Sequence, residues 1–268
     1  MDVTSQRKSL TAAKFLGETD PDPVAIFNRA MPGPFLFTCD HACNRIPARL
    51  GDMGMTAAQL DSHIAWDPGA LPVAQGLARL FGSPLVYGAY SRLVVDLNRP
   101  PDAAGSMPET SAGIAIPGNA GLSEFQRQER LDALFHPYHE AIDGVLNERL
   151  RASRASALVA IHSFTPDYPG EARPWHVGII HRHDLGLGTA LVHALRDRDG
   201  LVVGDNLPFQ IQDDGDATIP RHGERRRLPN VLIELRQDTL ATAAAREAWV
   251  ARLHKALQRA LAAISPVA

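Results

Sequence analysis

The stretch Phe35-Leu-Phe-Thr-Cys-Asp-His41 is a short apolar, β-prone run that ends in two polar side chains. This pattern is typical of a buried strand that delivers polar groups into the loop after it. Further strand-like runs follow it along the chain, at residues 84–86, 93–95, 157–161, 176–180, 201–203 and 230–233. Segments with helical periodicity separate many of these runs. The alternation predicts an α/β fold with a mixed, largely parallel sheet flanked by helices and buried on both faces.

Helix signals stand between the strand-like runs. Asp67-Pro68 precedes an apolar periodic stretch that stops at Phe81-Gly82, so we expect a helix over residues 68–80. Ser123 and Gln126 have the spacing of a capping box and open an amphipathic helix that Pro137 should kink. Further helices are expected over 187–198 and 238–264. The Pro/Gly/Ser-rich segment 100–121 reads as a long loop of functional length, such as a lid.

Length and composition indicate one enzyme-sized domain. The 268 residues can form a full α/β core, and no linker or internal repeat divides them. Residues 1–34 are polar and weakly periodic, so we expect an N-terminal arm followed by a catalytic domain over 35–268. The net charge of -3 gives no electrostatic case for nucleic acid or an anionic membrane. No apolar run approaches the ~20 residues of a membrane helix, no signal peptide is recognisable, and two cysteines suit a reducing cytoplasm.

Three residues stand where a catalytic site would form. His41, His162 and Glu234 lie at or just past apolar strands, and ligands of such sheets gather beyond the carboxyl ends of the strands. Two imidazoles there suit zinc, which favours nitrogen ligands, although a single histidine at a strand end is more often structural. Cys39 and Cys43 flank His41, so a thiolate site is a rival interpretation, as is simple packing of the two cysteines.

The stretch Ser91-Arg-Leu-Val-Val-Asp-Leu-Asn-Arg-Pro100 surrounds an apolar run with charge. The guanidinium groups of its arginines can bind a carboxylate through two parallel hydrogen bonds, but an edge strand with paired surface charges would have the same sequence pattern. Glu234 interrupts the apolar run Val231-Leu-Ile-Glu-Leu235, which is unexpected because burying an unpaired carboxylate is costly. A structural ion pair of Glu234 with Arg236 or Arg92 is the alternative to a catalytic role.

Five motifs in order along the chain resemble the N-formylglutamate amidohydrolase family. They are Asp40-His-Ala42, Tyr90-Ser-Arg-Leu-Val-Val-Asp-Leu-Asn-Arg-Pro100, Ala160-Ile-His-Ser163, Ile219-Pro-Arg-His-Gly223 and Leu232-Ile-Glu-Leu235. The resemblance covers about residues 35–238, and its most specific piece is Asp-Leu-Asn-Arg-Pro. That family is similar to zinc carboxypeptidases and aspartoacylase. The resemblance therefore implies a single zinc carboxypeptidase-like (phosphorylase/hydrolase-like) domain with one catalytic Zn²⁺.

The resemblance also implies a ligand set for the metal. His41 is the first implied ligand and His162 the last. The carboxypeptidase relatives place a glutamate three residues after the first histidine, where this chain has Asn44, a weaker ligand. Asp67 matches an aspartate of the family and is the preferred third ligand. An aspartate before proline at a helix start is also an ordinary N-cap.

The remaining implied roles concern the substrate. Glu234 corresponds to the general base of the relatives, and Arg92 is placed to polarise the scissile carbonyl. Asn98 and Arg99 match a pair that grips the substrate carboxylate. Arg221 and His222 belong to a basic loop that could close over an anionic substrate, although such runs are usually solvated. The other histidines are expected to be structural or exposed: His63, His136, His176, His181, His183 and His193. His139, with His136, resembles a Tyr-His element of the family.

These features together predict a zinc-dependent enzyme of the cytoplasm that hydrolyses an N-acyl acidic amino acid, such as N-formylglutamate to formate and glutamate. The partner is then a small-molecule substrate rather than nucleic acid or a membrane. A zinc carboxypeptidase or amidase acting on peptides would share the machinery. A non-catalytic binding protein on the same scaffold is the third hypothesis, because Asn44 replaces a ligand. The sequence does not decide the acyl group, the amino acid or the oligomeric state.

Overall fold

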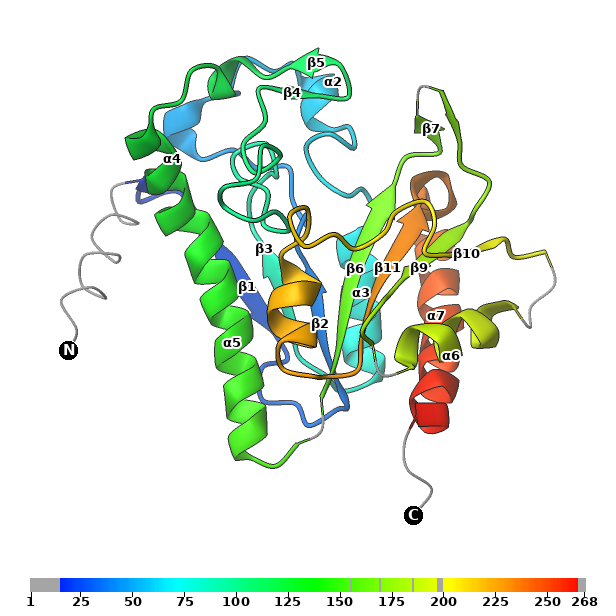
Figure 1. Cartoon of the computed structure of the whole chain (residues 1–268). Helices are drawn as coiled ribbons and strands as arrows, with labels where there is room; N and C mark the ends of the chain where they lie inside the picture. The colour runs from blue at the N-terminus through cyan, green and yellow to red at the C-terminus, as the bar shows by residue number, and fades with distance from the viewer. Residues whose placement is uncertain (1–14, 155, 169, 185, 197–199, 265–268) are drawn as a thin grey trace.

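The computed structural model describes residues 15–154, 156–168, 170–184, 186–196 and 200–264 (Figure 1). Within these residues the main sheet has seven strands in the order β1-β3-β2-β6-β11-β9-β10. Their bounds are β1 Val24–Phe27, β2 Phe35–Cys39, β3 Leu85–Gly88, β6 Ala157–Phe164, β9 Val177–Ile180, β10 Val203–Asp205 and β11 Asn230–Arg236. The strands β3, β2, β6 and β11 run parallel, whereas β1 and β9 are antiparallel to their neighbours β3 and β11. The predicted mixed, largely parallel sheet is confirmed.

Helices cover both faces of this sheet, as Figure 1 shows. On one face lie α3 (Ala70–Leu80), α6 (Leu187–Arg196) and α7 (Ala243–Ile264), whose apolar side chains pack on Phe35, Phe37 and Ile161. On the other face lies α5 (His136–Arg151), which packs on the alternate strand residues Leu36, Leu158 and Ala160. Because successive strand residues point to opposite faces, a strand covered on both sides is apolar throughout. All five residues of β2 are accordingly buried.

Short elements form the loops above the sheet. They are η1 Ala48–Leu50, α2 Ala57–Leu60, β4 Thr110–Ser111, β5 Ile114–Ala115, η2 Pro117–Asn119, β7 Asp167–Tyr168, β8 Glu171–Ala172, η4 Ile219–Glu224 and η5 Gln237–Leu240. The pairs β4–β5 and β7–β8 are small antiparallel hairpins. The segment expected to be one long loop, 100–121, therefore contains the β4–β5 hairpin and the 3₁₀ turn η2.

One predicted strand is wrong. Residues 93–95 form no strand; they make a buried turn in which Val94 N donates to Ser91 O, and Leu93, Val94 and Val95 pack into the core. Apolar character alone does not separate a strand from a buried turn, because both hide their side chains. The other strands occur within a few residues of their expected positions. The last helix begins at Ala243, and η5 occupies the first residues expected for it.

The helix predicted to kink at Pro137 changes its hydrogen-bonding pattern there. It runs as α4 (Glu124–Arg130), the π-helical segment η3 (Leu131–Phe135) and α5. Proline has no N–H to donate and its ring crowds the preceding turn, and a wider π-helical turn at that point accommodates both effects. The capping box at Ser123 is present: Gln126 N donates to Ser123 Oγ, and Gln126 Oε1 accepts from Ser123 N.

The arm expected over residues 1–34 lies partly outside the described residues, which begin at residue 15. The same holds for residues 1–17, in which no signal peptide is recognisable. The strand β1 of the arm adds to the edge of the main sheet beside β3. The boundary at residue 34 stays a prediction. Among the described helices, none combines the length and apolar character needed to cross a bilayer.

Candidate active site

Two histidines face each other at the ends of neighbouring parallel strands. His41 lies two residues after the end of β2, and His162 lies within β6, which pairs with β2. Both side chains are buried, and their ring centroids are 5.0 Å apart. The parallel pairing brings residues more than a hundred positions apart to one edge of the sheet. This is the convergence that the sequence predicted.

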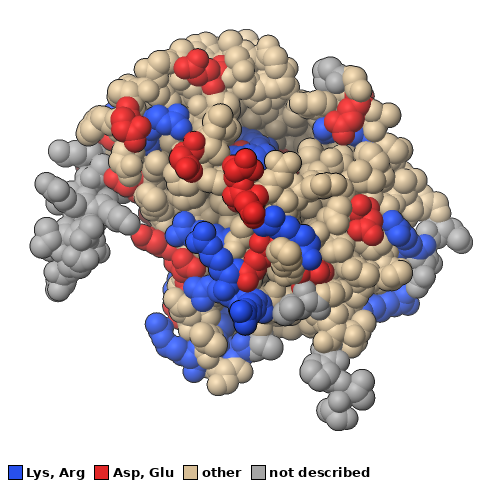
Figure 2. All heavy atoms as spheres, in the orientation of Figure 1, with Lys and Arg blue, Asp and Glu red and all other residues tan. Residues whose placement is uncertain are grey.

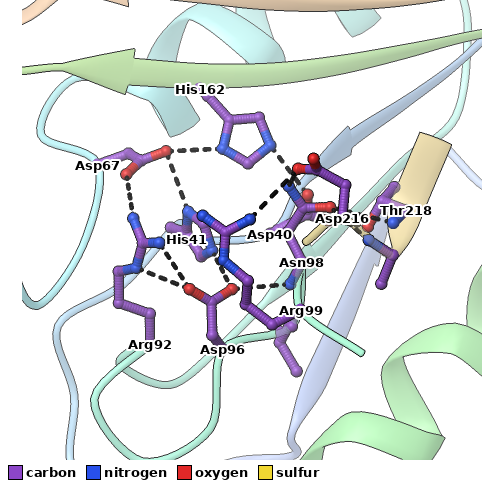
Figure 3. A network of polar contacts seen from close by, with 12 residues as sticks. Asp40, His41, Asp67, Arg92, Asp96, Asn98, Arg99, His162, Asp216 and Thr218 are labelled. Atoms are coloured by element: carbon purple, nitrogen blue, oxygen red, sulfur yellow. Dashed lines mark hydrogen bonds and ion pairs between the residues drawn. The ribbon is translucent and has the colours of Figure 1, made fainter. Parts of the chain in front are cut away.

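Asp67 joins these histidines (Figure 3). Its Oδ2 lies 2.9 Å from His162 Nδ1 and 3.3 Å from His41 Nδ1, and it also accepts a hydrogen bond from Ser163 N. The helix α3 has Gly69 at its N-cap and no side-chain cap, so Asp67 does not act as the cap that its position before proline suggested. Asn44 points elsewhere, since its amide donates to Leu60 O and Asp61 Oδ1.

A second layer of carboxylates holds the outer nitrogen of each imidazole. His41 Nε2 lies 2.7 Å from Asp96 Oδ1, and His162 Nε2 lies 2.9 Å from Asp40 Oδ2. Tyr138 and Thr218 donate hydrogen bonds to the other oxygen of Asp40. Sequence reasoning did not select Asp40 or Asp96 for this role. Both are acids beside buried apolar runs, and that signal could have identified them.

The donor set suits a zinc ion. One ligand atom from each of His41, Asp67 and His162 lies within 4.8 Å of the others, and all three residues are buried. Two nitrogens and one carboxylate oxygen are the ligands of many catalytic zinc sites, which leave a further position for water or substrate. Carboxylates on the outer imidazole nitrogens orient such histidine ligands and fix the tautomer. Among the described residues neither cysteine joins the cluster.

The electrostatics of the cluster formed by His41, Asp67 and His162 point the same way. Burial alone would lower the pKa of His162, but Asp40 and Asp67 outweigh burial and raise it well above its usual value. Burial would raise the pKa of Asp67, but His41 and His162 hold it below its usual range. The buried carboxylates therefore require positive charge between them. A divalent cation supplies that charge without protons on the ligand nitrogens.

Glu234 lies beside this cluster. It sits on β11 directly opposite His162 in the strand register, and it is 8% exposed. Burial raises the pKa of Glu234 to about 7, and its Oε2 has no hydrogen-bond partner among the described residues. Neither arginine considered as its ion-pair partner takes that role. Arg236 pairs with Asp238, and Arg92 pairs with Asp96 at 2.6 Å. A carboxyl group that titrates near neutrality is suited to proton transfer.

Arg92, Asn98 and Arg99 all line the cavity next to the cluster. Arg92 Nη1 lies 3.7 Å from Asp67 Oδ1. Asn98 Nδ2 donates to Asp216 Oδ1 at 3.2 Å, and Arg99 Nη1 lies 3.4 Å from the same oxygen. The sequence predicted Asn98 and Arg99 as a carboxylate grip, and they do hold a carboxylate, that of Asp216. Asp216 was missed because nothing local marks it.

His222 and Arg221 do not line the cavity. His222 is fully buried, stacks on His139 at 5.0 Å and lies 3.0 Å from Asp143 Oδ1. His139 Nε2 in turn lies 2.9 Å from Leu97 O, so these imidazoles form a packed polar network between α5 and η4. The placement corrects the expectation that His222 closes over the substrate. Figure 2 shows basic side chains gathered over this part of the surface, as expected for a solvated basic loop.

The cavity encloses about 590 Å³ and opens between the β4–β5 turn and the β7–β8 hairpin, where the surface in Figure 2 is hollowed. Ser111 and Ala112 border one side of it, and Tyr168 and Arg173 border the other. His63, expected to be structural or exposed, lines it as well. A volume of this size lies in the roughly 300–1,000 Å³ range of small-molecule sites.

The family model of N-formylglutamate amidohydrolase matches residues 33–241. The chain belongs to the N-formylglutamate amidohydrolase family. Membership makes the protein an amidohydrolase with a small-molecule substrate, and the cavity just described lies within the matched residues. The predicted resemblance is therefore confirmed. No curated protein matches the chain in a comparison of sequences.

Two crystal structures resemble this member of the family. A gene product of Agrobacterium tumefaciens is 39% identical with a TM-score of 0.90, and the match covers 93% of this chain and 99% of that one. An N-formylglutamate amidohydrolase from Ralstonia eutropha JMP134 is 18% identical with a TM-score of 0.60, and the match covers 90% of this chain and 98% of that one. The second similarity shows the shared fold.

Proposed function

We propose that the protein is a zinc-dependent enzyme that hydrolyses N-acyl derivatives of acidic amino acids, with N-formylglutamate as the reference substrate. The observation that carries the proposal is the buried set of His41, Asp67 and His162 beside Glu234, whose carboxyl group has an unpartnered oxygen. The family match supports the amide-hydrolysing chemistry. The cysteine usage supports the cytoplasm as its location.

The metal would be held by His41 Nδ1, a carboxylate oxygen of Asp67 and His162 Nδ1. When bound, zinc supplies Lewis acidity, which lowers the pKa of water toward ~7 and polarises an acyl carbonyl. Asp96 and Asp40 keep the two imidazoles in the orientation that presents Nδ1 to the ion. This assignment uses Asp67 rather than Asn44 as the third ligand.

Proton transfer falls to Glu234. Its carboxylate accepts the proton of the attacking water and then delivers it to the departing amine nitrogen, so that the C–N bond breaks as a free amino group forms. Arg92 stands at the cavity wall beside Asp67, where its guanidinium can donate to the oxygen that gains charge in the transition state. Asn98 and Arg99 orient the substrate through its carboxylate, for which Asp216 is the internal stand-in.

Metal analysis combined with a substrate assay tests this function. We expect about one zinc per chain after dialysis and hydrolysis of N-formylglutamate to formate and glutamate. His41→Ala and His162→Ala should lose the zinc, and Asp67→Ala should weaken its binding more than the matched control Asn44→Ala. Loss of zinc in Asn44→Ala with retention in Asp67→Ala would overturn the ligand assignment. Faster cleavage of short peptides than of N-acyl amino acids would instead indicate a peptidase.

A further inference from the structure

The cavity extends beyond the metal ligands into a second region, the aromatic lobe, formed by Phe164, Tyr168 and Phe209 around Arg173. The guanidinium carbon of Arg173 lies 4.3 Å from the ring centroid of Tyr168, 5.2 Å from that of Phe209 and 6.0 Å from that of Phe164. All four side chains line the same cavity as His162 and Glu234. The lobe is therefore part of the candidate active site rather than a separate pocket.

Arg173 lies between the three aromatic rings of the lobe and is held in place by hydrogen bonds. It is 8% exposed, and its Nη1 and Nη2 donate to Thr165 O and to Glu171 at 3.3 and 2.9 Å. These contacts fix Nη1 and Nη2, whereas the buried Nε has no hydrogen-bond partner among the described residues, and the guanidinium attracts the surrounding rings by cation–π interaction. Tyr168 and Phe209 are nonetheless 42% and 38% exposed. Large aromatic faces that stay open at the wall of an active-site cavity are suited to bind an apolar or planar group.

Strand alternation makes the lobe continuous with the metal ligands. Phe164 follows His162 by two residues on β6, so both side chains point to the same face of the sheet. On the neighbouring strand β11, Glu234 lies opposite His162 in the register. A substrate with its scissile amide beside Glu234 therefore has the aromatic lobe next to it along β6.

The aromatic lobe and the pair Asn98 and Arg99 have different neighbours in the cavity. His63 lines the cavity, and its buried Nε2 has no hydrogen-bond partner among the described residues. Burial lowers the pKa of His63, and the nearby charges of Arg92 and Arg173 lower it further, so His63 lies close to both arginines. Asp216, in contrast, contacts Asn98 and Arg99. If the amino-acid carboxylate is held at Arg99 and the carbonyl at Arg92, the acyl group extends toward His63 and the lobe.

We propose that the aromatic lobe is an acyl subsite, and that the enzyme prefers N-acyl amino acids with an aromatic acyl group over their N-formyl counterparts. The inference rests on the proposed function for the reaction itself. A formyl group has no atom that could reach the rings, whereas a benzoyl group presents a planar ring to Tyr168 and Phe209. Water adds to the benzoyl carbon, the C–N bond breaks and the proton goes to nitrogen, giving benzoate and free glutamate.

The test compares N-benzoylglutamate with N-formylglutamate on the zinc-loaded enzyme. Burial of an aromatic ring should raise kcat/KM for the benzoyl compound about tenfold or more over the formyl compound. Phe209→Ala should lower the ratio of kcat/KM for the benzoyl compound to kcat/KM for the formyl compound by about three- to tenfold. Phe125→Ala is the matched control, because Phe125 is 71% exposed on α4 and does not line the cavity. It should change neither rate.

A second variant and a binding measurement separate failure of the subsite from failure of the reaction. Tyr168→Ala should reproduce the selective loss if Phe209→Ala does not fold. In zinc-loaded Glu234→Gln, calorimetry should show tighter binding of N-benzoylglutamate than of N-formylglutamate, and Phe209→Ala should abolish that difference. Equal or better use of the formyl compound, or equal loss of both substrates in Phe209→Ala, would overturn the subsite. If neither compound is hydrolysed the proposed function fails, and the calorimetry alone decides on the lobe.

Discussion

At the scale of single residues, the site is a set of buried charges that compensate one another. Asp40, Asp67 and Asp96 surround His41 and His162, and each carboxylate has at least one hydrogen bond to an imidazole. Breaking a buried pair is costly because the remaining charge loses its partner. For each single substitution in this cluster, both folding and metal content therefore have to be measured. Glu234 and Arg99 lie at the cavity wall and can be tested more simply.

Glu234→Gln keeps the shape of the side chain but cannot accept a proton. We expect kcat for N-formylglutamate to fall by roughly 10²–10⁴-fold, the usual contribution of a general base, while zinc stays bound. Turnover and zinc content should be measured on the same preparation. Glu224→Gln is a suitable control, since that glutamate pairs with Arg182 and does not line the cavity. Near-normal turnover of Glu234→Gln would exclude Glu234 as the base.

Arg99→Lys keeps the positive charge but loses the planar fork that matches a carboxylate. A hydrogen bond to a charged group contributes about 1.5–3 kcal/mol, or about ten- to over a hundredfold in affinity. The variant should retain fold and zinc but lose most of its preference for N-formylglutamate over N-formylglutamine. The ratio of kcat/KM for the two substrates measures the effect. If wild type shows no preference, or the variant keeps the wild-type ratio, Arg99 is not the carboxylate anchor.

At the scale of elements, local sequence rules account for most helix and strand positions. The start of α4 after the capping box at Ser123 follows from the hydrogen-bonding needs of helix ends, whereas α3 starts after Gly69 without a side-chain cap. The π-helical segment η3 ahead of Pro137 follows from the missing N–H of proline. The exception is the turn at residues 93–95, which is apolar because it packs into the core beside α4 and η2, where Arg130 donates to Val94 O and Asn119 donates to Leu93 O.

The cap gives a stability prediction that is independent of the active site. Ser123→Ala removes the oxygen that accepts from Gln126 N and should lower the free energy of unfolding by about 0.5–2 kcal/mol. Ser123→Gly should cost only a few tenths of a kcal/mol, because glycine is tolerated at an N-cap. Urea unfolding of the zinc-free protein measures both. An alanine variant as stable as wild type would show that the cap does not support the helix.

At the scale of the whole molecule, the buried network of His139 on α5 and His222 in η4 links stability to pH. Burial, together with the charges of His222 and Arg221, lowers the pKa of His139 to about 3. In the unfolded chain a histidine titrates near ~6.5. Between these two values the unfolded chain binds the extra proton, so stability is complete above pH ~6.5 and is lost as the pH falls.

We therefore expect His139 to account for about 2 kcal/mol of the stability lost between pH 7 and pH 5. His139→Gln should be less stable at pH 7 but should lose about that much less on acidification. The measurement is urea unfolding at both pH values with a chelator present, so that protonation of His41 and His162 contributes equally to both proteins. His193→Gln, at an exposed position of α6, should keep the wild-type slope. An unchanged slope in His139→Gln would contradict the prediction.

The sequence by itself determined the fold class, most elements and the identity of the chemical groups. Uninterrupted apolar runs and period-3.6 apolar patterns are local, so strands such as β2 and helices such as α3 could be predicted without knowing their neighbours. His41, His162 and Glu234 could be selected because each is polar beside an apolar strand. The family motifs added Asp67, Arg92, Asn98 and Arg99, which the structure brings to the same cavity.

Only the tertiary structure decided how these groups pair. Three features depend on loops whose ends lie far apart in the chain. They are the contacts of Asp96 and Asp40 with the imidazoles, the contact of Asp216 with Arg99, and the burial of His222 against Asp143. The aromatic lobe likewise joins β6, the β7–β8 hairpin and the segment after β10. Such contacts are set by strand register and by the packing of both sheet faces. No window of the sequence contains both partners, and so no local pattern could specify them.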